Sequence, residues 1–131
     1  MNDVRTVLLV DDDADIRTIG AISLEQVGGL AVTMAGSGRD GIDMAREVQP
    51  DVILLDMMMP DLDGLATLEL LREDPLTASI PVIFMTAKVQ QRDVGGYVDA
   101  GAIGVIAKPF DPLALAAEVK AIVAGVQSAD T

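Results

Sequence analysis

The sequence predicts an α/β domain in which five buried strands alternate with five helices. Three observations support this fold class. The length of 131 residues suits one domain. Half of the residues are hydrophobic and 23% are charged, which is typical of a globular chain. Short apolar runs alternate with segments of helical periodicity, and this alternation indicates a parallel sheet with helices on both faces.

The expected strands are short runs rich in Val, Ile and Leu. The runs are continuously apolar and do not alternate with polar residues, so we expect strands that are buried on both faces. The five runs are Thr6–Val10, Ala31–Ala35, Val52–Leu55, Pro81–Met85 and Gly104–Ala107.

The segments between the runs carry apolar residues at helical spacing. The expected inward faces hold Ile16, Ile19, Leu24 and Val27; Ile42, Ala45 and Val48; Leu65, Leu68, Leu70 and Leu71; Val94, Tyr97 and Val98; and Leu113, Ala117, Val119 and Ile122. Gly28-Gly29 and Gly101 are expected helix stops, and Asp111-Pro112 is an expected helix start. We expect the domain to span residues 4–125, with loose termini at 1–3 and 126–131.

Composition excludes several classes of function. The chain has no Cys and no His, which excludes disulfides, thiolate or imidazole metal sites, and Ser-His-Asp triads. A net charge of -12 predicts that neither nucleic acid nor an anionic membrane is a direct partner. No signal peptide and no membrane-spanning run is visible, so we expect a cytoplasmic location.

Polar residues follow four of the expected strands. They are Asp11 and Asp12 after the first strand, Asp56 after the third, Thr86 after the fourth and Lys108 after the fifth. The carboxyl ends of parallel strands meet at one edge of the sheet, where chemistry gathers in this class of fold. Clustered carboxylates repel one another without a cation, and oxygen ligands favour Mg²⁺. Because an Asp can itself become an aspartyl phosphate, the pattern predicts metal-assisted phosphorylation of one Asp.

Four motifs carry a resemblance to a known family. They are VLLVDDD at 7–13, DVILLDMMMPDLDG at 51–64, PVIFMTA at 81–87 and GAIGVIAKPF at 101–110. With these motifs the chain resembles a stand-alone, chemotaxis-regulator-like receiver domain of the two-component response regulators. The resemblance implies a flavodoxin-like (βα)₅ fold with strand order 2-1-3-4-5.

The resemblance implies a role for each site residue. Asp56 would be the phosphoryl acceptor. Asp11, Asp12 and Asp56 would hold Mg²⁺ together with the backbone carbonyl of Met58.

Two further residues would hold the phosphoryl group. Thr86 would hydrogen-bond to it and move toward it on activation. Lys108 would pair with a phosphoryl oxygen, next to a cis Lys108-Pro109 bond.

The sequence departs from the family at the position three residues before Lys108. Receivers commonly carry Tyr or Phe there, whose ring couples phosphorylation to the output face, and this chain carries Val105. We therefore expect a weaker or differently built switch, using Tyr97 or the fourth helix with its Gly95-Gly96 pair.

Met58 and Lys88 occupy the two positions that tune dephosphorylation in the family. A methionine cannot position an attacking water by hydrogen bonding, so we expect a long-lived phosphoryl group.

The resemblance also implies the partners. A sensor histidine kinase or a histidine phosphotransfer protein would phosphorylate Asp56. The face made by the fourth helix, fifth strand and fifth helix would then contact a downstream protein. The chain would not be an enzyme beyond its own phosphoryl transfer and autodephosphorylation.

Three other classes of protein share parts of this pattern. A haloacid-dehalogenase-like phosphatase would use Asp11 as nucleophile, but the sequence lacks the later acidic pair and a cap domain. A flavodoxin-like electron carrier needs aromatics around its flavin, and this chain has three aromatic residues in all. A calcium-binding loop starting at Asp11 fails because Ile16 and Ile22 stand where Gly and Glu are needed.

Overall fold

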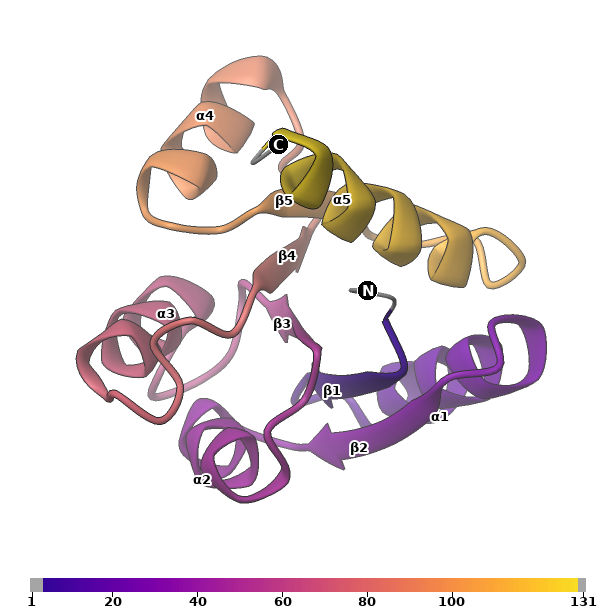
Figure 1. Cartoon of the computed structure of the whole chain (residues 1–131), viewed down its shortest axis with the longest axis horizontal. Helices are drawn as coiled ribbons and strands as arrows, with labels where there is room; N and C mark the ends of the chain where they lie inside the picture. The colour runs from indigo at the N-terminus through magenta and orange to yellow at the C-terminus, as the bar shows by residue number, and fades with distance from the viewer. Residues whose placement is uncertain (1–3, 130–131) are drawn as a thin grey trace.

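The computed structural model describes residues 4–129 and shows one five-stranded parallel sheet between two layers of helices (Figure 1). The strand order is β2-β1-β3-β4-β5, as the resemblance implies. The strands are β1 (Thr6–Val10), β2 (Ala31–Ala35), β3 (Val52–Asp56), β4 (Val82–Thr86) and β5 (Gly104–Ala107). The helices are α1 (Ala14–Ile22), continued by the π-helical turn η1 (Ser23–Val27), α2 (Gly38–Val48), α3 (Gly64–Glu73), α4 (Gln91–Asp99) and α5 (Leu115–Ala129).

The five predicted strands are confirmed, with a shift of one residue at three ends. The prediction of burial on both faces is wrong for β2 and β5, which are only partly buried because they lie at the two edges of the sheet. The three inner strands, β1, β3 and β4, are almost wholly buried, because helices cover both faces of the sheet. β3 extends to Asp56, and β4 starts at Val82 and extends to Thr86. Asp56 and Thr86 therefore belong to the strands themselves, and the hydrogen bonds of the sheet hold their backbones.

The core is divided by the sheet into two layers. One layer packs β-strand residues against α2, α3 and Tyr97 of α4, with Phe84 of β4 fully buried in it. The other layer packs the opposite strand faces against η1 and α5. Leu24 of η1 and Val119 of α5 are fully buried there.

The predicted helix stops agree with the structure, whereas the predicted start at Asp111-Pro112 is three residues early, because residues 112–114 form a turn and α5 begins at Leu115. Gly28 ends η1 and is followed by Gly29 with a φ of 68°, and Gly101 follows α4 with a φ of 116°. The side chain of Asp111 accepts a hydrogen bond from the backbone N–H of Leu113, which starts the turn that leads into α5. α5 continues to Ala129, whereas residues 1–3 and 130–131, expected to be loose, lie outside the described residues.

The predicted inward faces of the helices are partly wrong. Exposed residues among those expected to face inward are Ile19, Val27, Val48, Leu65, Leu70, Val98, Leu113 and Ala117. In the first helix the wider π-turn changes the angular register, so Ser23 and Leu24 face the core. In α5 the buried stripe begins at Leu115, and Leu113 lies before the helix, 77% exposed. Within residues 4–129 no helix is both long and apolar enough to cross a membrane.

Candidate functional site

The polar residues at the strand ends form one cluster at the carboxyl edge of the sheet. Parallel pairing sets Asp56 beside Met85 and Thr86 beside Ala107, so the ends of β3, β4 and β5 lie next to one another. Asp11 directly follows β1, the other neighbour of β3. The sheet register thus brings together residues that are far apart in the chain.

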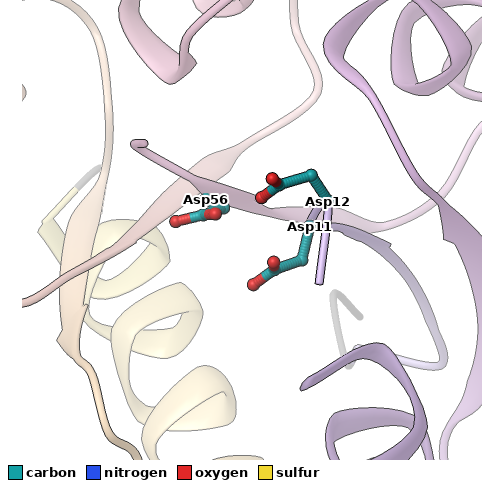
Figure 2. A group of neighbouring side chains, drawn as sticks. All are labelled: Asp11, Asp12 and Asp56. Atoms are coloured by element: carbon teal, nitrogen blue, oxygen red, sulfur yellow. The ribbon is translucent and has the colours of Figure 1, made fainter. Parts of the chain in front are cut away.

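Three carboxylates from two strand ends meet at this edge. One oxygen each of Asp11, Asp12 and Asp56 lies within 4.8 Å of the others (Figure 2). Asp11 and Asp56 are buried, and Asp12 is exposed. Three hard oxygen donors in this arrangement fit a divalent cation such as Mg²⁺, which binds through one or two carboxylates and keeps several waters. The exposed side at Asp12 leaves the cluster accessible to solvent.

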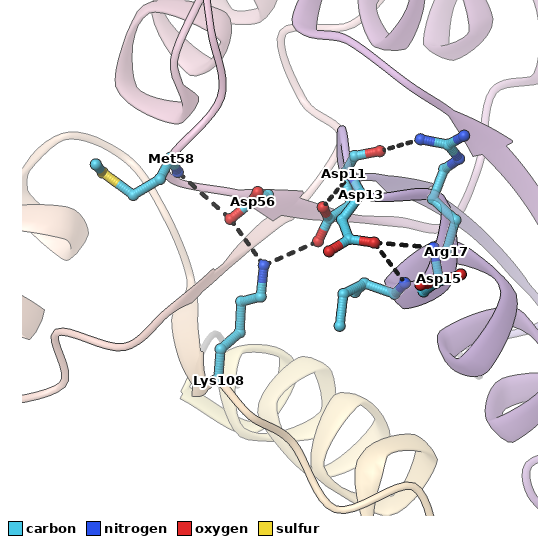
Figure 3. A network of polar contacts seen from close by, with 8 residues as sticks. Asp11, Asp13, Asp15, Arg17, Asp56, Met58 and Lys108 are labelled. Carbon is cyan, nitrogen blue, oxygen red and sulfur yellow. Dashed lines mark hydrogen bonds and ion pairs between the residues drawn. The ribbon is translucent and has the colours of Figure 1, made fainter.

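Lys108 joins the two buried carboxylates. Its Nζ lies 3.0 Å from Oδ2 of Asp11 and 3.3 Å from Oδ1 of Asp56 (Figure 3). Burial alone would lower the pKa of the Lys108 amine. The hydrogen bond and charge of Asp11, followed by those of Asp56, outweigh burial and raise this pKa above its usual value. Lys108 is therefore held as a cation at the site.

One cation does not balance the cluster. Burial, followed by the negative charge of Asp11, raises the pKa of Asp56 to about 6, against the opposing effect of Lys108. The carboxylate of Asp56 is thus held in an environment that lacks positive charge. A divalent cation at the carboxylates would supply that charge.

Backbone groups hold the two buried carboxylates in place. Oδ1 of Asp56 accepts a hydrogen bond from the N–H of Met58 at 3.3 Å, and Oδ1 of Asp11 accepts one from Asp13 at 2.9 Å. The side chain of Asp13 in turn accepts from the N–H groups of Asp15 and Ile16 and caps α1. Asp13 therefore serves the helix start, as is typical of acidic residues at a helix N-terminus.

Sequence reasoning did not single out Arg17 of α1. Its guanidinium donates to the backbone carbonyl of Asp11 at 2.7 Å, which ties the helix to the loop that carries the carboxylates (Figure 3). A lone Arg in a helix gives no signal in the sequence, because its partner becomes visible only in the fold.

Thr86 lies at the edge of the cluster. It is buried, its hydroxyl accepts a hydrogen bond from the N–H of Lys88 at 3.1 Å, and its carbonyl accepts from the N–H of Lys108 at 3.0 Å. Within the described part of the chain, Thr86 makes no hydrogen bond to Asp56. Its backbone therefore links the loops after β4 and β5.

The remaining predicted residues are placed as follows. The side chain of Met58 is 72% exposed and points away from Asp56 (Figure 3). Lys88 is exposed, and Val105 of β5 is half-buried opposite Phe84. The Lys108-Pro109 peptide bond is cis.

Comparison with known proteins gives a consistent result. Residues 7–120 match the sequence model of the response regulator receiver domain. The DNA-binding dual master transcriptional regulator RpaA of Synechocystis sp. is 40% identical over 116 residues, 88% of this chain and 48% of RpaA. The transcriptional regulatory protein CseB of Streptomyces coelicolor is 37% identical, over 93% of this chain and 50% of CseB. The chain thus spans about half the length of the curated relatives it matches.

Solved structures show the same likeness. The chemotaxis protein CheY4 of Vibrio cholerae superposes with a TM-score of 0.83 at 27% identity, covering 91% of this chain and 98% of CheY4. A putative response regulator from Chloroflexus aurantiacus gives 0.81 at 31% identity, covering 92% and 98%. These matches give no support to the phosphatase alternative with Asp11 as nucleophile.

Proposed function

This chain belongs to the response regulator receiver family of two-component systems, and from that premise we propose that Asp56 accepts a phosphoryl group in the presence of Mg²⁺. The observation that carries the proposal is the position of Asp56. Its carboxylate shares the ammonium group of Lys108 with Asp11 and has an oxygen within 4.8 Å of one oxygen each of Asp11 and Asp12. A buried carboxylate beside a cation and two further carboxylates that can hold a metal is suited to nucleophilic attack on phosphorus.

Asp11, Asp12 and Asp56 would hold the ion, together with the backbone carbonyl of Met58. When bound, Mg²⁺ supplies positive charge that stabilises a transferring phosphoryl group. Lys108 would shift its hydrogen bond from Asp56 to a phosphoryl oxygen, since its Nζ already lies 3.3 Å from Oδ1 of the acceptor. The hydroxyl of Thr86 would donate to another phosphoryl oxygen.

The donor would be a phosphohistidine of a sensor histidine kinase or a histidine phosphotransfer protein. In this step the N–P bond of the donor breaks and a bond forms between phosphorus and a carboxylate oxygen of Asp56. The electron pair of the broken bond stays on the imidazole nitrogen. The histidine of the donor is then neutral and exchanges protons with solvent. The 131 residues hold no histidine, so the phosphohistidine of this proposal lies outside them.

The phosphorylated domain, over residues 4–125, would signal to a downstream protein through the face of α4, β5 and α5. We place this exchange in the cytoplasm, and we propose that the domain performs no catalysis beyond its own phosphoryl transfer and dephosphorylation. Two of the curated relatives are named as DNA-binding or transcriptional regulators. We propose that the receiver domain itself does not contact nucleic acid, because its net charge is -12.

The test is incubation with acetyl phosphate and MgCl₂, followed by intact mass measurement. We expect the mass to rise by one phosphoryl group, and we expect Asp56→Asn to abolish the rise. Peptide mapping after borohydride reduction locates the acyl phosphate. A label on Asp11 would favour the phosphatase alternative, and a rise that persists in Asp56→Asn would contradict the assignment.

A further inference from the structure

Helix α4 is attached to the sheet by few contacts. None of its nine residues is fully buried. Tyr97 is the residue of α4 that packs, half-buried, against the buried cluster of β-strands, α2 and α3. Its ring meets the ring of Phe84 edge-to-face, with centroids 5.5 Å apart and an interplanar angle of 68°. Such an aromatic pair has a preferred geometry, so displacement of one ring favours displacement of the other.

Phe84 also lies against the backbone that follows the proposed acceptor. A Cβ placed on Gly64 would lie 3.1 Å from Cε1 of Phe84 and 2.8 Å from the carbonyl oxygen of Asp56. The N–H of Gly64 donates to the carbonyl of Met57 at 2.9 Å. The ring of Phe84 and the loop after Asp56 are therefore in close contact. Because protein interiors are close-packed, a shift of this loop requires the ring to adjust.

The C-terminal end of α4 is held in place by hydrogen bonds. Arg72 of α3 donates to the carbonyl of Ile80 at 2.9 Å and to that of Gly101 at 3.2 Å. The N–H of Ala102 donates to the carbonyl of Tyr97 at 3.1 Å.

The N-terminal part of α4 is held less firmly. Gln90 caps the helix without a side-chain hydrogen bond. At Gly95 and Gly96, in the middle of the helix, no atom of the other described elements lies within 4 Å of a placed Cβ. A helix held at one end and loose at the other can change its angle to the sheet, with Tyr97 between the two parts.

We propose that Tyr97 is a positioning residue that sets the orientation of α4. In this route, phosphorylation of Asp56 shifts the backbone at Gly64, which displaces the ring of Phe84. The displaced ring then moves Tyr97 and with it α4. The proposal rests on the proposed function, because it requires a phosphoryl group on Asp56. It assigns the coupling to a ring on α4, whereas Val105 of β5, which pairs with Phe84 in the sheet, offers no ring. The phosphoryl group shifts the equilibrium only if the two orientations of α4 differ in this contact.

The chain carries its own probe for this contact. Tyr97 is the single tyrosine and there is no tryptophan, so tyrosine emission reports on α4 alone. We would record this emission and the intact mass on the same samples, with MgCl₂ and acetyl phosphate. We expect the emission to change in proportion to the phosphorylated fraction and to stay constant in Asp56→Asn under the same conditions.

The matched variants are Phe84→Leu and Phe110→Leu. Phe84 packs in the layer of α4, whereas Phe110 packs against the opposite layer. We expect Phe84→Leu to be phosphorylated and to lose the emission change, and Phe110→Leu to keep it. A change that persists in Phe84→Leu overturns the route through Phe84.

Amide chemical shifts give a second measurement that does not depend on Phe84→Leu folding. We expect the shifts of α4 to respond to phosphorylation in wild type and in Tyr97→Phe, which keeps the ring. We expect the response to be lost in Tyr97→Leu, at equal phosphoryl mass. If the mass rises while emission and α4 shifts stay constant in wild type, the inference is wrong and the proposed function stands. If the mass does not rise, the proposed function itself is overturned, and this inference with it.

Discussion

Lys108 lies 3.3 Å from Asp56 across the edge of the sheet, so the proposed acceptor is paired with a cation before a phosphoryl group is present. The same ammonium group lies 3.0 Å from Asp11, which is fully buried. Breaking a buried pair by removing one partner leaves an uncompensated charge and is strongly destabilising. This relationship leads to the first of four predictions.

We predict that Lys108→Met lowers the free energy of unfolding in EDTA at pH 8 by roughly 1–3 kcal/mol, because two buried carboxylates lose their cation. We also predict that Mg²⁺ stabilises this variant more than wild type, since the ion then supplies the missing charge. Urea denaturation with and without MgCl₂ measures both. Lys120→Met is the control, because Lys120 is exposed and donates only to the carbonyl of Gly28. Equal losses in the two variants would contradict the prediction.

The raised pKa of Asp56, about 6, predicts a pH dependence of stability in the absence of metal. The folded pKa lies above the model-compound value of 3.8, so the protonated carboxyl favours the folded state. The stability that this group contributes is fully present below pH 3.8 and is lost as the pH rises through about 6. Asp56→Asn should therefore be more stable than wild type above pH 6, by at most about 3 kcal/mol.

Urea denaturation in EDTA from pH 4.5 to pH 8 measures this difference. The same proton competes with Mg²⁺, so the apparent affinity for Mg²⁺ should fall as the pH drops below 6. If the free energies of unfolding of Asp56→Asn and wild type differed by the same amount at every pH from 4.5 to 8, the carboxyl of Asp56 would titrate outside this range and the prediction would be wrong.

Gly95 and Gly96 in α4 are predicted to be replaceable by alanine with a gain in stability. Each glycine in a helix interior is about 1 kcal/mol less favourable than alanine, and no atom obstructs a Cβ at either position. Gly95→Ala and Gly96→Ala should each raise the free energy of unfolding by up to about 1 kcal/mol and slow amide hydrogen exchange in α4.

The matched control is Gly64→Ala. A Cβ there would lie 2.8 Å from both the carbonyl oxygen of Asp56 and the Cα of Met57, so this variant should be destabilised. Should Gly95→Ala and Gly96→Ala both lose stability, the glycines would have a packing role that the structure does not show.

Met58→Asn is predicted to shorten the lifetime of the phosphoryl group severalfold. The side chain of Met58 is 72% exposed, so the fold should tolerate the change, and an amide can orient an attacking water by hydrogen bonding. The decay of the phosphorylated mass after removal of acetyl phosphate measures the lifetime. Met34→Asn, on the edge strand β2 and 46% exposed, is the control. Identical decay in wild type and Met58→Asn would count against the tuning role.

The five strands could be predicted from the sequence because each is a continuous apolar run, and such runs are distinctive of strands buried on both faces. The residues of the site could be predicted because they follow these runs. The inward faces of the helices were harder to predict. Ile19 and Leu113 have the right spacing but lie on exposed surface, because Gly20 and Ala21 are the residues of α1 that face inward and because α5 begins only at Leu115.

By itself, the sequence determined the order of the elements and the chemistry of the site. The carboxylates, the hydroxyl and the amine at the strand ends can be identified from the sequence, because their places depend only on the residues next to them in the chain. The tertiary structure decided which of these groups interact. The pairing of Lys108 with both Asp11 and Asp56, the raised pKa of Asp56 and the contact of Phe84 with Tyr97 depend on separations across the sheet. Those separations are set by strand register and close packing between residues that are distant in sequence, and a pattern along the chain does not record them.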